Sequence, residues 1–330
     1  MSDQSQLPRR SGRGAHRRRR RLIVATVIVA AALAVSVREI ALDQPGSLRR
    51  LEHGVADPSS ADQAVNPSLF SPGACMAFAP SRGNRHLTVF LDAGHGGIDP
   101  GAVGTTESGQ TIHEADETLP VELDAMAILR HDGFRVVVSR TAATSVVRLD
   151  GGDVSSGALT IQGAHSDVAA RDICANLAHA NILIGIYFDA GASADNAGSV
   201  TGYDAVRPFA ADNFKLAGLV QTEVLAAMNA EGWAIPDDGV VSDVNLGGPA
   251  LTGTAASYGH LLLLGPAEAG YFSTPSQMPG ALIEPLFITD PFEGSIAASA
   301  TGQRVIATGL AHAVEQYFAP PATSASGTTG

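Results

Sequence analysis

One stretch of the sequence, residues 91–102 (LDAGHGGIDPGA), combines a histidine with four glycines. It follows residues 87–90 (LTVF), an apolar and partly β-branched run of the length expected for a buried strand. Glycine permits positive φ and close approach of another group, and sites in α/β sheets form where strands end. An imidazole held on such a turn is suited to bind a metal or to transfer a proton, so His95 is the first candidate. Taken alone, a structural histidine is the alternative.

The whole string resembles the opening motif of the zinc-dependent N-acetylmuramoyl-L-alanine amidases, which is a strand followed by Asp-x-Gly-His-Gly-Gly-x-Asp-Pro-Gly-Ala. Further motifs extend the resemblance over about residues 87–318. It implies an enzyme that uses Zn²⁺ to cut peptidoglycan between the lactyl group of N-acetylmuramic acid and L-alanine. Hydrolysis of this amide requires a strong nucleophile and a group that stabilises the oxyanion. A zinc ion with about three protein ligands and one open position supplies both, and a nearby carboxylate moves the proton.

Glu114 is the second candidate metal ligand. Residues 114–119 (EADETL) are similar to the family's Glu-x-Asp-x-x-Leu motif at the start of a helix, where the glutamate binds zinc. The resemblance implies the same role for Glu114. An acid in the first turn also stabilises a helix dipole, which is the alternative. In that case Asp116 or Glu117 could serve equally, and His113 could bind if the register slips.

Glu284 is the candidate for the acid that transfers the proton. It ends the apolar run 281–284, and Pro285 keeps it extended rather than helical. Residues 281–291 are similar to the closing motif of the family, which implies that Glu284 acts first as general base and then as general acid. A surface carboxylate after an edge strand is the alternative.

The sequence departs from the family at the third zinc ligand. The family has Ser-Ile-His-x-Asn-Ala, whereas residues 185–190 read GIYFDA, with Tyr187 in the position of the histidine. Tyr187 could bind through an ionised phenol, or Asp189 could bind because residues two apart on a strand share a face. A histidine from elsewhere, His260 or His165, could also complete the site. Because a lost ligand lowers metal affinity, an inactive peptidoglycan-binding module is one alternative function, and a zinc peptidase acting on stem peptides is another.

Other residues are predicted to support or cover the site. Arg171 and Asn176 precede the Tyr187 strand at the family's spacing and are interpreted as structural supports. The long segment 190–260 is predicted as an insertion that lines or covers the site. It contains Trp233, the only tryptophan, which could stack on a sugar or stem peptide or could serve as a core anchor.

The elements that must position these residues alternate between strands and helices. Strands are predicted at 87–92, 134–139, 181–188, 261–264 and 281–284, and helices at 114–131, 166–180, 211–231 and 301–318. Ser166 is the predicted N-cap of the second helix, and residues 290–293 (DPFE) have the pattern of an N-cap, a first-turn proline and a capping-box acid. The alternation predicts the α/β class, with a single twisted, mostly parallel sheet and helices on both faces.

The charge distribution indicates export. Residues 1–21 contain eight arginines and one acid, and the remainder has 13 basic and 32 acidic residues, which argues against nucleic-acid binding. The apolar run 22–37 follows the arginines, so residues 1–38 are predicted as a signal peptide or membrane anchor, with the rest outside the cytoplasm. In that compartment Cys75 and Cys174 could form a disulfide, although two buried thiols are the alternative.

The catalytic domain is predicted at residues 87–318, where the motifs lie. Residues 39–86 are predicted as a linker, partly ordered near Cys75, because they are rich in Pro, Ser, Asp and Gly. Residues 319–330 are predicted as a disordered tail of low complexity.

Overall fold

The computed structural model describes residues 62–246 and 252–320. The predicted signal peptide or anchor over residues 1–38 lies outside this part of the chain, as does the beginning of the predicted linker. Among the described helices, none combines the length and the apolar character needed to cross a membrane.

The centre of the protein is an eight-stranded sheet in the order β1-β2-β6-β3-β9-β12-β10-β11. Its strands are β1 (Gln63–Ala64), β2 (Ala74–Phe78), β3 (Thr88–Ala93), β6 (Arg135–Arg140), β9 (Ile182–Ile186), β10 (Ser199–Tyr203), β11 (Asp237–Ser242) and β12 (Gly280–Glu284). β6, β3, β9 and β12 are parallel neighbours, whereas β10 runs antiparallel to β12 and parallel to β11. The central strands therefore end at one edge of the sheet, and β10 and β11 end at the opposite edge. This topology confirms the predicted class.

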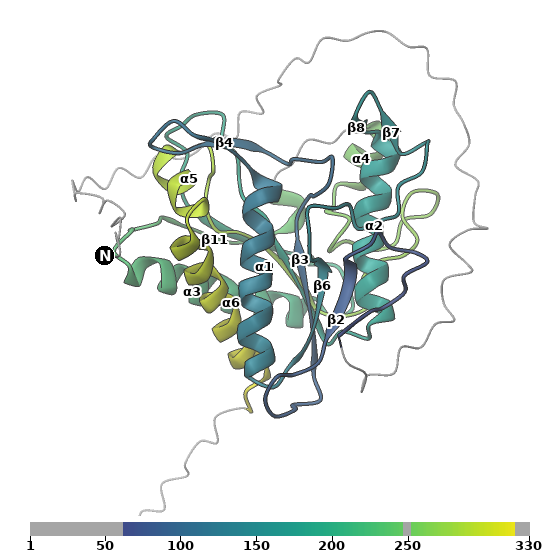
Figure 1. Cartoon of the computed structure of the whole chain (residues 1–330), viewed down its shortest axis with the longest axis horizontal. Helices are drawn as coiled ribbons and strands as arrows, with labels where there is room; N and C mark the ends of the chain where they lie inside the picture. Colours follow the sequence, from purple (N-terminus) through teal and green to yellow (C-terminus); the bar gives the residue numbers. More distant parts are fainter. Residues whose placement is uncertain (1–61, 247–251, 321–330) are drawn as a thin grey trace, which may run out of the picture.

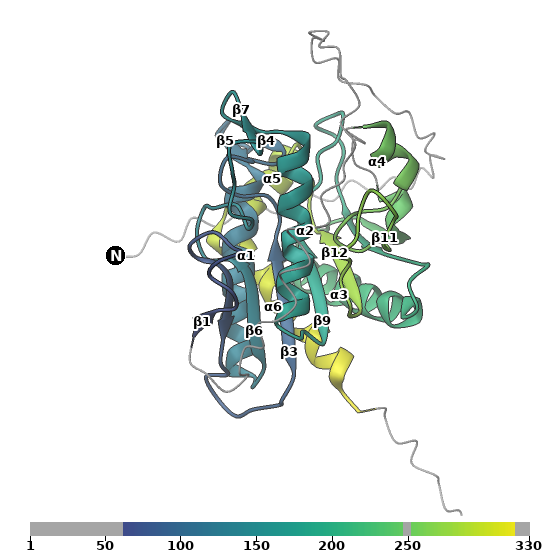
Figure 2. The same ribbon diagram turned by 90° about the vertical axis from the view of Figure 1, so that its right-hand side faces the viewer.

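Helices cover both faces of the sheet (Figures 1 and 2). They are α1 (Glu114–His131), α2 (Ile161–Leu177), α3 (Ala210–Ala230), α4 (Gly253–Tyr258), α5 (Pro291–Ala297) and α6 (Ala300–Phe318). α1, α3 and α6 bury apolar side chains against Leu91 and Ile184 on one face. α2 packs on the other face, where Phe90 and Leu183 belong to a second apolar cluster. Two short hairpins, β4 (Val103–Thr105) with β5 (Thr111–His113) and β7 (Val154–Ser155) with β8 (Ala158–Leu159), complete the fold.

Two helix starts test the sequence patterns directly. The Asp290 side chain accepts hydrogen bonds from the backbone N–H groups of Phe292 and Glu293, which confirms the predicted N-cap of α5. The predicted start of α2 at Ser166 is wrong, because Thr160 is the N-cap and its hydroxyl accepts from the N–H of Gly163 at 3.0 Å. The first turn of α2 lacks the apolar spacing that would have marked it in the sequence.

The segment from 190 to 280 differs most from the prediction. Residues 261–264 form a turn and not the predicted strand, and Leu263 covers Gly185, whose missing Cβ would lie 2.8 Å from the leucine Cδ2. The predicted insertion 190–260 instead contributes β10 and β11 to the sheet. These strands were missed because each is short and β11 lies at the exposed end of the sheet.

The sheet also begins earlier than predicted. Within residues 62–86, which were assigned to the linker, β1 and β2 extend the sheet by antiparallel pairing of β2 with β6. A disulfide joins Cys75 of β2 to Cys174 of α2, with Cα atoms 5.7 Å apart. This stretch is ordered because Ala74, Cys75 and Ala77 are buried in the apolar cluster beneath α2.

Candidate active site

The glycine-rich turn after β3 holds His95 at the edge where the central strands end. His95 has φ 59°, in the left-handed region, and the glycines on either side allow the chain to fold tightly around it. Gly101 packs directly against the candidate ligands, since a Cβ there would lie 2.7 Å from both Glu114 Oε2 and His95 Cδ2. The turn therefore brings the imidazole against the first residue of α1.

His95 and Glu114 converge on one point. The Nε2 atom of His95 lies 3.1 Å from Oε2 of Glu114, and its Nδ1 atom lies 2.8 Å from Oδ2 of Asp99. Glu114 is buried, and it accepts hydrogen bonds from the N–H groups of Ala102 at 2.9 Å and Phe188 at 3.0 Å. Burial lowers the pKa of His95, but the contacts with Asp99 and Glu114 outweigh it and raise that pKa to about 10. Asp99 thus orients the ring, and Nε2 faces the buried carboxylate.

The alternatives to Glu114 have other partners. His113 Nδ1 lies 3.7 Å from Asp116 Oδ2 on the surface of the first helical turn. Glu117 accepts a hydrogen bond from Gln303 at 2.9 Å. Only Glu114 of this group contacts His95.

Two further carboxylates belong to the same cluster. Glu284 ends β12, and Asp189 follows β9 and pairs with Phe287 in a parallel bridge. Burial and the negative charges of Asp189 and Glu114 raise the pKa of Glu284 well above its usual range, while His95 opposes the change. Burial also raises the pKa of Asp189 to about 6, with a contribution from Glu114. The structure thus gathers His95 and three carboxylates at one edge of the sheet.

The phenol of Tyr187 is directed toward Asp92. Its hydroxyl donates to Oδ2 of Asp92 at 3.2 Å, and its ring stands edge-on to the His95 ring with centroids 5.5 Å apart. The ring also fills the space beside Gly94, where a Cβ would lie 2.5 Å from the tyrosine Cε1. Burial, and then the charge of Asp92, raise the pKa of Tyr187 well above its usual value, which disfavours an ionised phenol.

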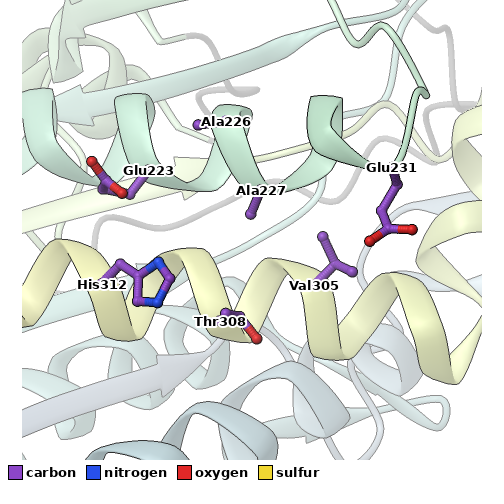
Figure 3. Close-up of a pocket in the computed structure, with 7 residues that line it drawn as sticks. All are labelled: Glu223, Ala226, Ala227, Glu231, Val305, Thr308 and His312. Atoms are coloured by element: carbon purple, nitrogen blue, oxygen red, sulfur yellow. The ribbon is translucent and has the colours of Figure 1, made fainter.

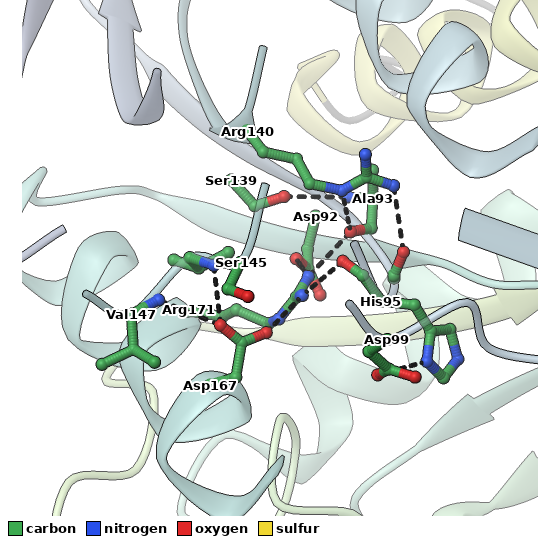
Figure 4. A network of polar contacts seen from close by, with 12 residues as sticks. Asp92, Ala93, His95, Asp99, Ser139, Arg140, Ser145, Val147, Asp167 and Arg171 are labelled. Carbon is green, nitrogen blue, oxygen red and sulfur yellow. Dashed lines mark hydrogen bonds and ion pairs between the residues drawn. The ribbon is translucent and has the colours of Figure 1, made fainter. Parts of the chain in front are cut away.

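Two buried arginines hold the turn from beneath (Figure 4). Arg171 donates to Asp92 at 2.5 Å, to Asp167 at 2.9 Å, and to the backbone carbonyls of Ala93 and His95 at 2.7 and 2.8 Å. Arg140 donates to the carbonyls of Gly94 and Ala115 at 3.1 and 2.7 Å. The arginines therefore fix the backbone on both sides of His95 and connect it to α1.

Asn176 acts at a distance from the turn. Its side-chain amide donates to the carbonyl of Pro275 and accepts from the N–H of Gln277, at 3.0 and 2.8 Å. It therefore fixes the segment that leads into β12. The sequence reasoning included Arg171 and Asn176 but missed Asp92 and Arg140, although each is a charged residue at the end of an apolar strand, and that pattern was a usable signal.

The remaining sequence candidates lie elsewhere. Trp233 is 3% exposed within the apolar core, so the suggestion that it stacks on substrate is wrong. His260 contacts Asp204 and Asp243, which follow β10 and β11 and so lie at the opposite edge from His95. The His165 ring packs against Tyr271, with centroids 5.0 Å apart.

A hollow between α3 and α6 is a separate feature (Figure 3). It is lined by Glu223, Ala226, Ala227, Glu231, Val305, Thr308 and His312. Figure 3 shows these side chains between the two helices, and the lining includes neither His95 nor any carboxylate of its cluster. We therefore do not assign catalysis to this hollow.

A histidine and carboxylates gathered where parallel strands end, on an α/β sheet, define a site suited to hydrolysis. The N-acetylmuramoyl-L-alanine amidase family matches residues 89–316, and the chain belongs to this family. It is 28% identical over 244 residues to the N-acetylmuramoyl-L-alanine amidase AmiA of Salmonella typhimurium, an alignment that covers 72% of this chain and 77% of that protein.

Solved structures share the fold. The CwlD amidase of Clostridioides difficile, solved in complex with the GerS lipoprotein, superposes with a TM-score of 0.52 at 20% identity, covering 70% of this chain and 98% of that one. Cwp6 of Clostridium difficile superposes with a TM-score of 0.50 at 18% identity, covering 72% of this chain and 30% of that one. The family match and the similarity to AmiA establish the protein as a peptidoglycan amidase, and the solved structures share its fold.

Proposed function

We propose that this enzyme cuts the amide bond between the lactyl group of N-acetylmuramic acid and L-alanine with the help of Zn²⁺, and that Glu284 is its general base. The observation that carries the proposal is the convergence of His95 Nε2 and Glu114 Oε2, 3.1 Å apart, with the half-buried Glu284 close enough for its charge to interact with both groups. Imidazole and carboxylate are ordinary zinc ligands. Neighbouring carboxylates that repel one another also favour a bound cation, so the residues present fit zinc.

Asp189 is the third ligand in this proposal. Its charge interacts with that of Glu114, and its backbone N–H and carbonyl are fixed by Leu286 and Ile288 beside β12. Tyr187 fits the role less well, because its hydroxyl donates to Asp92 and its pKa is raised. We assign Tyr187 instead to positioning, since its ring packs between His95 and Gly94.

A bound zinc ion would supply positive charge to polarise the amide carbonyl and to make water acidic at neutral pH. Glu284 would accept the proton of the attacking water and pass it to the leaving nitrogen of L-alanine. Its raised pKa suits the first step, because a more basic carboxylate accepts a proton more readily. Asp99 would keep Nδ1 of His95 protonated, so that Nε2 remains available as a ligand.

We further propose that the enzyme acts outside the cytoplasm, with the basic and apolar N-terminal segment as its export signal or membrane anchor. Two observations support this location. Peptidoglycan is the substrate of the family, and the disulfide between Cys75 and Cys174 belongs to an oxidising compartment.

The test is digestion of purified peptidoglycan by Glu284→Gln, with the exposed Glu231→Gln as matched control. Wild type and Glu231→Gln should release intact stem peptides that begin with L-alanine. Loss of the general base should lower the rate by about 10² to 10⁴-fold while leaving zinc content unchanged. Release of free amino acids would indicate a peptidase instead, and binding without release would indicate a wall-binding module.

The choice of third ligand is tested by metal analysis. Asp189→Ala should lose zinc, whereas Tyr187→Phe should retain it and lose only the hydrogen bond to Asp92. Loss of zinc from Tyr187→Phe alone would assign the ligand to the phenol.

A further inference from the structure

A second cluster of metal-ligating side chains lies at the opposite edge of the sheet from His95. Asp204 follows β10 and Asp243 follows β11, and the paired residues Tyr203 and Ser242 bring them to the same level. His260 comes from the turn after α4. Its Nδ1 atom lies 3.0 Å from Oδ2 of Asp204 and 3.0 Å from Oδ2 of Asp243. The three ligand atoms lie within 4.8 Å of one another.

Hydrogen bonds from His260 and from the N–H of Leu261 satisfy Oδ2 of Asp243, but one carboxylate oxygen of this cluster receives none. The imidazole Nδ1 carries at most one proton, and the hydrogen bond it forms is to Asp243. Asp204 is fully buried, and its Oδ1 accepts from the N–H groups of Val206 and Arg207 at 2.7 and 2.8 Å. Its Oδ2 points at the histidine and receives no hydrogen bond. An unpaired carboxylate oxygen in the interior is costly, and a cation would remove that cost.

A third buried carboxylate faces the same region. Asp172 of α2 is fully buried, and neither of its oxygens has a hydrogen-bond partner. Asp172, Asp204 and Asp243 all interact electrostatically with Tyr258, whose ring stands edge-on to His260 with centroids 5.4 Å apart. The guanidinium of Arg207 donates to the carbonyls of Gly265 and Ser276. The interior between α2 and residues 252–276 therefore lies beside three buried carboxyl groups.

We propose that Asp204 Oδ2, Asp243 Oδ2 and His260 Nδ1 bind a second divalent cation, distinct from that of the amidase centre, and that zinc is the preferred ion. Zinc with ligands at about 2.0–2.1 Å in a tetrahedron needs ligand atoms about 3.3 Å apart. The two 3.0 Å separations from His260 are within a few tenths of an ångström of that value. Calcium, which takes six to eight oxygen ligands, fits poorly.

The role of this ion is structural. It would join the ends of β10 and β11 to the segment after α4, whose Leu263 and Leu264 are buried over β9 and β12. The hollow lined by His260, Tyr258, Glu268 and Tyr271 gives the ion a route from solvent. The cation would thereby keep the segment after α4 packed on the sheet, at the edge opposite the amidase centre.

Zinc stoichiometry of the full chain with Glu114→Gln, in which the amidase centre lacks a ligand, tests the proposal. The protein is stripped with a chelator, reloaded with zinc and dialysed. It should hold one zinc per chain, and added zinc should raise its thermal midpoint. Adding Asp204→Asn or His260→Gln should remove this zinc, weakening binding roughly tenfold or more, and should abolish the thermal shift. The exposed His312→Gln is the matched control and should behave like its parent.

Two results would overturn the proposal. One is a stripped Glu114→Gln protein with a native circular-dichroism spectrum that binds no zinc. The other is unchanged zinc content in the Asp204→Asn and His260→Gln variants. Failure of the amidase centre would be seen separately, as a wild type that holds no more zinc than Glu114→Gln.

Discussion

Replacement of Arg171 by methionine tests how the turn that carries His95 is supported. The guanidinium is 1% exposed and donates to Asp92, Asp167 and the carbonyls of Ala93 and His95. Methionine fills a similar volume without a charge. The variant therefore leaves two buried carboxylates without their cation and two carbonyls without their donor.

The expected loss of stability follows from these contacts. Removing one partner of a buried ion pair typically costs about 3–5 kcal/mol, because an uncompensated charge remains in the interior. For a domain of this size each kcal/mol lowers the melting temperature by about 2–4 °C, so we expect a decrease of roughly 6–20 °C. Arg171→Lys keeps the charge but loses the planar guanidinium, so its decrease in melting temperature should be smaller than that of Arg171→Met.

Urea unfolding followed by circular dichroism measures these values, with the exposed Arg304→Met as control. In the double variant Asp92→Asn with Arg171→Met, one of the two stranded charges is removed. The decrease in the free energy of unfolding of the double variant should therefore be smaller than the sum of the decreases in the two single variants. A loss below about 1 kcal/mol in Arg171→Met, or strict additivity in the double variant, would refute this account of the turn.

Three further predictions follow from the described contacts. Replacing Cys75 and Cys174 by serine opens a loop with a sequence separation of 99 and should lower the free energy of unfolding by up to about 4.7 kcal/mol, measured by urea unfolding against the oxidised wild type; an unchanged value would contradict it. Burial raises the pKa of Glu122 to about 8, whereas the unfolded value is about 4.3, so the folded state retains a proton that the unfolded state loses as pH rises. The free energy of unfolding of the wild type should therefore fall between pH 5 and pH 8, and this fall should be about 3 kcal/mol smaller in Glu122→Gln. An equal pH dependence of the two proteins in urea unfolding would exclude this effect. Gly101→Ala places a Cβ 2.7 Å from Glu114 Oε2 at a residue with φ 66°. It should lower the zinc affinity and reduce the free energy of unfolding by about 1–2 kcal/mol. A variant with wild-type zinc content and melting temperature would contradict the packing of Gly101 on Glu114.

The sequence allowed prediction of those parts of the fold that depend on local patterns. The helix from Glu114 to His131 was predicted with its observed bounds, and the N-cap at Asp290 was found from four consecutive residues. The strand that delivers Glu284 was predicted to within one residue. In each case the sequence pattern that gave the prediction spans only a few helical turns or a few consecutive residues.

The parts that sequence reasoning missed depend on contacts between distant segments. Asp92 and Arg171 are 79 residues apart, and nothing local indicates that they meet. β10 was hidden because a five-residue strand next to a long helix has too few residues to show alternation. Residues 261–264 were predicted as a strand because four leucines fit a buried strand equally well. Their apolar character was right, and the turn conformation was decided by packing on Gly185.

The antiparallel strand β2 determines where this chain can be shortened. The region matched by the family begins at residue 89, so a protein cut to that region would lack β2 and its disulfide. β6 would then become the border of the sheet, with Val136, Val137 and Val138 in an unpaired row. Such open borders recruit strands from neighbouring molecules, so the trimmed enzyme should associate and precipitate where the longer chain remains dispersed.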